Sequence, residues 1–313
     1  MSSPSPFRSE AARSRYLKAY EEWSAGWPVP SEQRFVPTSY GSTFVRGSGP
    51  VDAPPLVLLP GAGATSLMWS ANVAALSAHH RVWAVDSIAD YGRSEPSRPV
   101  HTAQDFVTWL DELTTALAPG GRFGLAGVSY GAWISAQYAL ARPERLSALA
   151  LIAPAGTVMP LGLGFMLRAV SCALPSRFFT RRFMTWLAHD LSVGDAQSQS
   201  QLERRIEEGY LAIRSFKARR LVEPSVLSDE QLRALPSPTL FIVGENERIF
   251  PASAAVERLR RVAPGIDIDL VPGAGHDVTL VRAEYVTTRL LGLFGAGTPA
   301  EARVSSVHPA PTG

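Results

Sequence analysis

The stretch from Gly124 to Gly131, Gly-Leu-Ala-Gly-Val-Ser-Tyr-Gly, constrains the fold more than any other part of this chain. An apolar run, Phe123 to Val128, leads into Ser129, and a helical pattern follows at once. The motif is G-x-S-x-G, which is typical of a serine on a sharp turn between a strand and a helix. Side chains at Gly127 or Gly131 would collide with each other and with the neighbouring strand, so the turn needs glycine. A plain strand-to-helix turn is the alternative if the motif stood alone.

Strand and helix patterns alternate on both sides of this motif. Continuous apolar runs such as Leu56–Leu59 are typical of strands buried on both faces of a parallel sheet. The alternation predicts an α/β fold, a mostly parallel central sheet with helices on both faces, and functional groups at the carboxyl ends of the strands. The predicted strands are 35–38, 43–45, 56–59, 81–86, 123–128, 146–152, 239–243 and 266–271, and the predicted helices are 8–23, 67–77, 102–117, 132–140, 251–262 and 278–294.

Residues 156–235 interrupt the alternation. They are rich in aromatic residues and methionine in a helical pattern, and they are too many for a bare loop. We expect a helical cap inserted over the strand ends, with Phe165 and Trp186 as candidate substrate-binding residues; the alternative is that the aromatic side chains form the cap's own core. The predicted division is residues 1–155 and 236–295 for the two parts of the core, 156–235 for the cap, and 296–313 for a flexible tail.

The composition narrows the class of protein. With 46% hydrophobic residues, 19% charged residues and a net charge of +2, the chain is typical of a globular protein. The small net charge gives no reason to expect nucleic acid or a membrane as a partner. Cys172 is the sole cysteine, so an internal disulfide is impossible, and the amino terminus lacks the apolar region of a signal peptide. We therefore expect a cytoplasmic protein, and the sequence does not predict its oligomeric state.

A serine hydroxyl needs a neighbouring base to become a nucleophile. Of the six histidines, His276 lies in a glycine-rich loop, Pro-Gly-Ala-Gly-His, directly after a predicted strand. That position predicts an imidazole held over the sheet edge, where it would accept the proton of Ser129. The other five have simpler explanations at helix ends, in the cap or in the tail, at positions 79, 80, 101, 189 and 308.

The imidazole in turn needs a carboxylate to fix its tautomer. The loop Gly244–Arg248 follows a predicted strand and supplies two, and the chain order serine, acid, histidine is that of α/β-hydrolases. We favour Glu247, which is further from the strand and better placed to reach the histidine loop. Glu245 is the alternative, although it could instead bind loop amides. Asp277 is the third candidate for the acid. It directly follows His276, and the side chains of neighbouring residues in a turn usually point apart.

The oxyanion of the tetrahedral intermediate requires two amide donors. The first is expected from Tyr130, the residue after the nucleophile, and the second from Ala62 in the loop Pro60–Gly63. The alternatives for this loop are a simple turn or a dinucleotide-binding loop, but the third glycine of a dinucleotide motif is missing.

Taken together, these residues resemble the α/β-hydrolase superfamily, and in particular bacterial carboxylesterases that use glutamate as the triad acid. The resemblance covers about residues 20–293 and is weakest in the cap. It implies the triad Ser129–Glu247–His276, the amide donors Ala62 and Tyr130, and neither a metal nor an organic cofactor. Pro60-Gly61 replaces the His-Gly of many relatives, and glutamate instead of aspartate adds one methylene of reach.

The leading functional hypothesis is hydrolysis of a small-molecule carboxylic ester, or of a thioester, through an acyl-enzyme on Ser129. One alternative uses the same triad for acyl transfer, thioester release or cyclisation in biosynthesis. In that case the arginines at 177, 181, 182, 204 and 205 could meet an acidic carrier, although a solvated helical face also explains them. A further alternative is a ligand receptor on a hydrolase scaffold, since fold does not fix function.

Overall fold

The computed structural model describes residues 5–172, 174 and 176–295, so the tail predicted at 296–313 lies outside the described residues. The strands are β1 (Glu32–Thr38), β2 (Gly41–Ser48), β3 (Pro55–Leu59), β4 (Arg81–Val85), β5 (Glu95–Pro96), β6 (Phe123–Val128), β7 (Leu146–Ile152), β8 (Thr239–Gly244) and β9 (Asp267–Val271). The helices are α1 (Glu10–Ser24), η1 (Ser66–Ala71), α2 (Val73–Ser77), α3 (Ala103–Leu117), α4 (Tyr130–Ala141), η2 (Pro143–Arg145), α5 (Leu163–Cys172), α6 (Arg177–Leu187), α7 (His189–Ser192), α8 (Ala196–Ser215), α9 (Asp229–Arg233), α10 (Ala252–Val262), α11 (Val278–Val281) and α12 (Ala283–Phe294).

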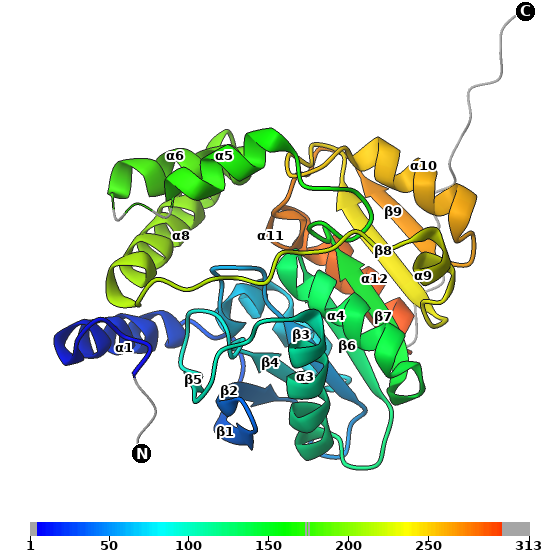
Figure 1. The fold of residues 1–313 in the computed structure, drawn as a ribbon, viewed down its shortest axis with the longest axis horizontal. Coiled ribbons are helices and arrows are strands. Elements are labelled where there is room, and N and C mark those ends of the chain that lie inside the picture. The colour runs from blue at the N-terminus through cyan, green and yellow to red at the C-terminus, as the bar shows by residue number, and fades with distance from the viewer. Residues whose placement is uncertain (1–4, 173, 175, 296–313) are drawn as a thin grey trace, which may run out of the picture.

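One sheet organises the molecule, with the strand order β1-β2-β4-β3-β6-β7-β8-β9 and β5 paired to β2 (Figure 1). From β4 to β9 along this order, each strand is parallel to the next. By contrast, β2 is antiparallel to both of its neighbours in this order, β1 and β4. The predicted mostly parallel sheet is therefore confirmed. In the centre, Gly127 of β6 lies between Leu59 of β3 and Leu151 of β7. This register places the turn at Ser129 beside the loop that begins at Pro60.

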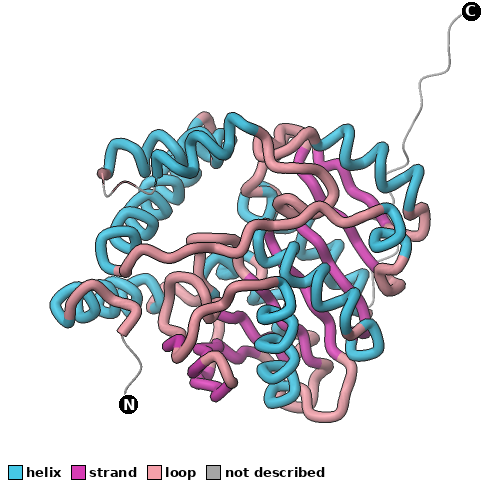
Figure 2. Tube along the Cα trace, viewed as in Figure 1, coloured by secondary structure: helices cyan, strands magenta, loops and turns pink. Residues whose placement is uncertain are grey.

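Both faces of the sheet are covered by helices, as Figure 2 shows. Successive residues of a strand point to opposite faces, so Val57 and Leu59 pack with α3, α4 and α10, whereas Leu56 and Leu58 pack with α2 and α12. This is why the central strands are apolar along their whole length.

Two predicted helices are broken where the sequence pattern is continuous. The helix predicted at 67–77 consists of η1 and α2, and the one predicted at 278–294 is divided between α11 and α12 at Arg282, whose φ and ψ are −126° and 43°. Both breaks meet at Asn72, which is fully buried and donates from its amide to Thr279 O (3.3 Å) and Thr287 Oγ1 (3.0 Å). The spacing of apolar residues along the chain does not reveal a buried amide side chain that bridges two helices.

The segment from residue 156 to residue 235, called the helical segment below, carries α5 to α9. In Figure 1, α5, α6 and α8 stand apart from α3 and α4, the helices that cover one face of the sheet. The expectation of a helical stretch is wrong for residues 217–228, which are extended and cross the molecule between α8 and α9. Tertiary hydrogen bonds hold this stretch, since Tyr130 Oη donates to Val222 O (2.8 Å) and Leu227 N donates to Thr157 O (2.9 Å). No helix in the described ranges has the length and apolarity needed to cross a membrane.

Candidate active site

Ser129 lies at the end of β6, directly before the first residue of α4. Its backbone has φ 54° and ψ −114°, a conformation that a non-glycine residue rarely adopts. The end of β7 and the loop after it hold it there, because Ser129 N donates to Ile152 O (2.8 Å) while Ser129 O accepts from Ala155 N (3.2 Å). Ser129 follows the carboxyl end of the central strand β6 and precedes the amino terminus of α4. The dipole of this helix favours negative charge at its amino terminus.

The two glycines of the motif are required for steric reasons. A Cβ added at Gly127 would lie 2.3 Å from Gly131 O, and one at Gly131 would lie 2.4 Å from Pro60 O. Both distances are far below van der Waals contact with rigid backbone. The collisions predicted from the sequence, within the motif and with the neighbouring strand, are thus present in the structure.

His276 and Glu247 meet at the ends of β9 and β8. His276 Nδ1 donates to Glu247 Oε2 at 2.8 Å, and the two side chains are 8% and 0% exposed. The second carboxylate oxygen, Oε1, accepts from the amides of Arg248 and Ile249, each at 2.8 Å. The carboxylate is therefore fixed on both sides, and a proton held on Nδ1 leaves Nε2 of the ring as the basic nitrogen.

The two rival carboxylates are engaged elsewhere. Glu245 is exposed, and its Oε2 accepts from Gly273 N at 3.4 Å, which is the loop-binding role considered for it. Asp277 forms an ion pair with Arg205 of α8. Among the described residues, Glu247 is the carboxylate that bonds the ring of His276.

The loop after β3 lies against the serine. A Cβ added at Gly61 would be 3.3 Å from Ser129 Cβ and 3.9 Å from its Oγ, so the backbone of this loop borders the nucleophile. Ala62 follows directly in the same loop and is exposed. Tyr130 is the first residue of α4, where backbone amides have no acceptor within the helix. Ala62 is thus next in the chain to Gly61, which borders the serine, and Tyr130 follows the serine directly; their role as amide donors stays a prediction.

Two aspartates to which the sequence analysis gave no role bind backbone amides at the carboxyl ends of the strands. Asp86, at the end of β4, is fully buried and accepts from Ser66 N (2.7 Å) and Tyr20 Oη (3.0 Å); burial raises the pKa of its carboxyl. Asp90 Oδ2 accepts from Gly63 N at 2.9 Å, which fixes the loop that contains Ala62. The sequence offered one indication of a structural role for Asp86, because this acidic residue directly follows an apolar strand.

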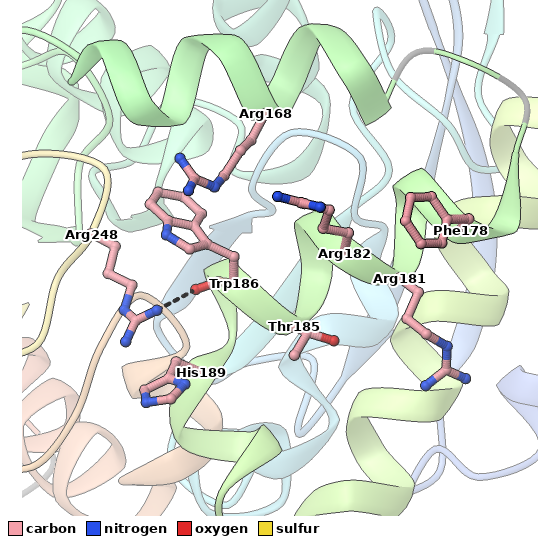
Figure 3. Close-up of a pocket in the computed structure, with 8 residues that line it drawn as sticks. All are labelled: Arg168, Phe178, Arg181, Arg182, Thr185, Trp186, His189 and Arg248. Atoms are coloured by element: carbon pink, nitrogen blue, oxygen red, sulfur yellow. Dashed lines mark hydrogen bonds between the residues drawn. The ribbon is translucent and has the colours of Figure 1, made fainter.

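Phe165 and Trp186 lie in the helical segment, on α5 and α6. Phe165 packs at the edge of the main core and faces Phe183, with ring centroids 6.0 Å apart. Trp186 lines a cavity of about 500 Å³ and its backbone oxygen accepts from Arg248 Nη1 at 3.4 Å (Figure 3). Neither residue has a described contact with Ser129, so their substrate-binding role stays a prediction.

The remaining histidines do not join the site. His80 is buried, with Nε2 3.4 Å from Phe294 O, and His189 lies on α7. His101 precedes α3, and His308 lies outside the described residues. Within the described ranges, no three or more His, Cys, Asp or Glu side chains group as metal ligands would.

Comparison with known proteins agrees with the fold. The sequence profile described as "Alpha/beta hydrolase family" matches residues 56–288. The chain belongs to the alpha/beta hydrolase family. It is 32% identical to "Uncharacterized carboxylesterase nap" of Bacillus subtilis, over 91% of this chain and 93% of the relative, and 32% identical to "Carboxylesterase YbfK" of the same organism, over 90% and 94%. The crystal structure of the naproxen esterase, carboxylesterase NP, from Bacillus subtilis superposes with a TM-score of 0.83, at 29% identity, over 91% of this chain and 99% of that one.

Proposed function

We propose that this α/β-hydrolase cleaves carboxylic esters through an acyl-enzyme on Ser129. The observation that carries the proposal is the 2.8 Å hydrogen bond between His276 and Glu247, made by two buried side chains that follow β9 and β8, on the same sheet whose central strand β6 ends directly before Ser129. The two relatives that are 32% identical over nine tenths of the chain are named carboxylesterases, which supports ester substrates.

Each residue has a role in this scheme. His276 Nε2 takes the proton of Ser129 Oγ as the oxygen attacks the ester carbonyl, and later gives it to the leaving alcohol. Glu247 holds the ring and stabilises its charged form. The amides of Tyr130 and Ala62 stabilise the oxyanion, and water then cleaves the acyl-enzyme and restores the serine. The scheme uses only side chains and amides of this chain and water.

We assign the helical segment the role of a cap over this site. Its contacts support the assignment, because Gly162 N donates to Ile249 O (2.7 Å) and Asn246 Nδ2 donates to Asp190 Oδ1 (3.4 Å). Both contacts reach the loop that carries Glu247. The acyl length that the cap would accept and a cytoplasmic location stay predictions.

The acyl-carrier alternative has less support from the arginines that suggested it. Arg177 pairs with Glu207, Arg181 with Glu203, Arg204 with Glu208 and Arg205 with Asp277, so four of the five already have carboxylate partners. A carrier would have to displace these partners. Comparing turnover of matched ester and thioester substrates would reveal a thioesterase preference if one exists.

The test of the proposal is the hydrolysis of p-nitrophenyl esters from acetate to laurate. We expect Ser129→Ala to lower kcat/KM by roughly 10⁴-fold or more, because the attacking oxygen is lost. Ser147→Ala, at an exposed position on β7, is the matched control and should retain wild-type activity. Full activity in Ser129→Ala would rule out the acyl-enzyme, and no turnover of any ester by folded wild-type protein would favour a receptor.

A further inference from the structure

A basic cavity lies between α5, α6 and the loop after β8, and the proposed triad does not use it. Its volume is about 500 Å³, and no acidic side chain is found among the described residues that line it. Figure 3 shows three guanidinium groups and an imidazole around the indole ring of Trp186. The side chains around the indole ring are those of Arg168, Arg182, His189 and Arg248, and Arg181 is a fifth cationic or titratable side chain of the lining.

The charge of this cavity is not balanced by the protein. In the described part of the chain, Arg168, Arg182 and Arg248 have no carboxylate within ion-pair distance. Neighbouring arginines of the helical segment behave differently. Arg181 also borders the cavity, but it points away from Trp186 and pairs with Glu203 (Figure 3). Like charges gathered without a counter-charge repel one another, and an anion in the cavity would remove that repulsion.

The guanidinium groups are held in place by neutral partners. The Arg168 guanidinium lies 4.7 Å from the centroid of the Trp186 ring, and its Nη1 donates to Gly164 O at 2.8 Å. Arg248 Nη1 donates to Trp186 O at 3.4 Å. Each guanidinium has five N–H donors, so most donors of both side chains stay available to a ligand.

We propose that this cavity binds a small organic anion, a carboxylate or a phosphate monoester, whose apolar body lies on Trp186. Guanidinium groups match the paired oxygens of both anions and bind them with charge-assisted hydrogen bonds. The aromatic ring of Trp186 supplies the apolar surface. Arg248 directly follows Glu247 in the chain, so the bound anion would lie next to the loop that carries the proposed triad acid.

The experiment is calorimetric titration of the full chain with benzoate and phenyl phosphate. Acetate supplies a carboxylate without the ring, inorganic phosphate supplies a phosphate without the ring, and benzyl alcohol supplies the ring without the charge. We expect one saturable site per chain for benzoate, phenyl phosphate or both, with a dissociation constant at least about tenfold lower than for the corresponding partial ligands. The difference between benzoate and phenyl phosphate identifies which anion the cavity prefers.

Variants locate the site. Arg182→Gln and Arg168→Gln should each raise the dissociation constant of the aromatic anion about tenfold or more, since each removes a charge-assisted contact. Arg214→Gln is the matched control, because Arg214 is exposed on α8 outside the cavity and its loss changes the net charge equally. Arg182 is itself exposed, so its replacement tests the site without risk to folding.

Two results would overturn the proposal. The first is that neither aromatic anion binds more tightly than its partial ligands. The second is that Arg182→Gln binds like the wild type, or that Arg214→Gln weakens binding as much. Because binding is measured without turnover, neither result depends on whether the chain hydrolyses esters.

Discussion

The carboxyl ends of the central strands, called the sheet edge, and the helical segment are held in place by different forces. Every residue of β6 is buried, and the turn after it is fixed by backbone contacts too close for any side chain. By contrast, α5 buries none of its residues and α6 buries only Thr180. The position of the nucleophile is thus set by steric exclusion, whereas the helical segment is held by ion pairs, by residues near its ends that join the core, and by a small apolar cluster of its own.

That apolar cluster consists of Ala188, which directly precedes α7, together with Leu191 of α7 and Leu202 and Ile206 of α8. Elsewhere the helical segment presents large apolar side chains to solvent, among them Leu163 at 82% exposure and Leu167 at 74%. Because α5 and α6 bury so few residues, we expect their surface positions to tolerate substitution. The proposed chemistry thus lies in the more rigid of the two regions, and a role of the helical segment in selecting the substrate stays a prediction.

The largest expected effect concerns the two glutamates of one loop at the sheet edge. We expect Glu247→Gln to lower kcat/KM by roughly 10³–10⁴-fold, because an amide cannot stabilise the charged ring or enforce its tautomer. Glu245→Gln should stay within about threefold of the wild type, since its carboxylate is exposed and bonds only a loop amide. Steady-state kinetics on one p-nitrophenyl ester compares them. Equal losses in both variants, or a larger loss in Glu245→Gln, would contradict the assignment of the acid.

The sheet edge was largely predictable from the sequence, for a physical reason. Strands buried on both faces must be continuously apolar, and a turn without room for side chains must use glycine, so burial and sterics leave a direct record in residue types. The elbow at Ser129 and the histidine loop could be located in this way. The choice of Glu247 over Glu245 rested on reach alone, and the amide contacts that orient the carboxylate could not be foreseen.

The helical segment was predicted only as a helical insertion. Its extended stretch at 217–228 is fixed by hydrogen bonds to distant residues, which leave no periodic pattern. The same limit applies to the breaks around Asn72 in the core, where one buried amide bonds residues more than two hundred positions away. The basic cavity around Trp186 likewise depends on which arginines find carboxylates, and the sequence does not specify those pairs.

A matched pair of glycines would sharpen the contrast between the two regions. Gly127→Ala should destabilise the fold by more than about 3 kcal/mol, or prevent folding, because the new Cβ would lie 2.3 Å from Gly131 O. Gly209→Ala, within α8, should stabilise it by about 0.5–1 kcal/mol, since its Cβ meets only Thr180 Cγ2 at 3.7 Å and alanine favours helix. Thermal unfolding followed by circular dichroism measures both. A Gly127→Ala protein that melts with the wild type would break the steric argument.

The next effect concerns the ion pairs between the helical segment and the core. Arg205→Met should cost about 2–4 kcal/mol of unfolding free energy, because it leaves Asp277, which is 8% exposed on its side chain, without its partner. Arg204→Met, its neighbour, loses an exposed pair with Glu208 and an exposed hydrogen bond to Trp23 O (3.2 Å), and should cost less than about 1 kcal/mol. Urea unfolding compares the two variants. Similar costs for both would mean that the buried pair does not anchor the segment.

The smallest effect is a dependence on pH at two helix starts, one in each region. In α3 of the core, Asp105 accepts from Tyr40 Oη (2.7 Å) and from two backbone amides, and these hydrogen bonds lower the pKa of its carboxyl to about 2. In α8 of the helical segment, a backbone hydrogen bond from Ser198 (2.8 Å) lowers the pKa of Asp195. A carboxyl whose pKa is lower in the folded state stabilises that state above its unfolded pKa of about 3.9, and the contribution is lost as the pH falls toward 2.

Asp105→Asn should therefore destabilise the protein at pH 6 and do so less at pH 3, by an amount below about 1 kcal/mol because the group is only partly buried and solvent screens its interactions. Asp195→Asn should show a smaller change in the same direction, since Asp195 accepts no hydrogen bond from a tyrosine. Urea unfolding of the wild type and both variants at the two pH values measures the difference. If Asp195→Asn showed the larger pH dependence, the polar contacts of the helical segment would be stronger than those of the core surface, and the contrast between the regions would hold only for their buried parts.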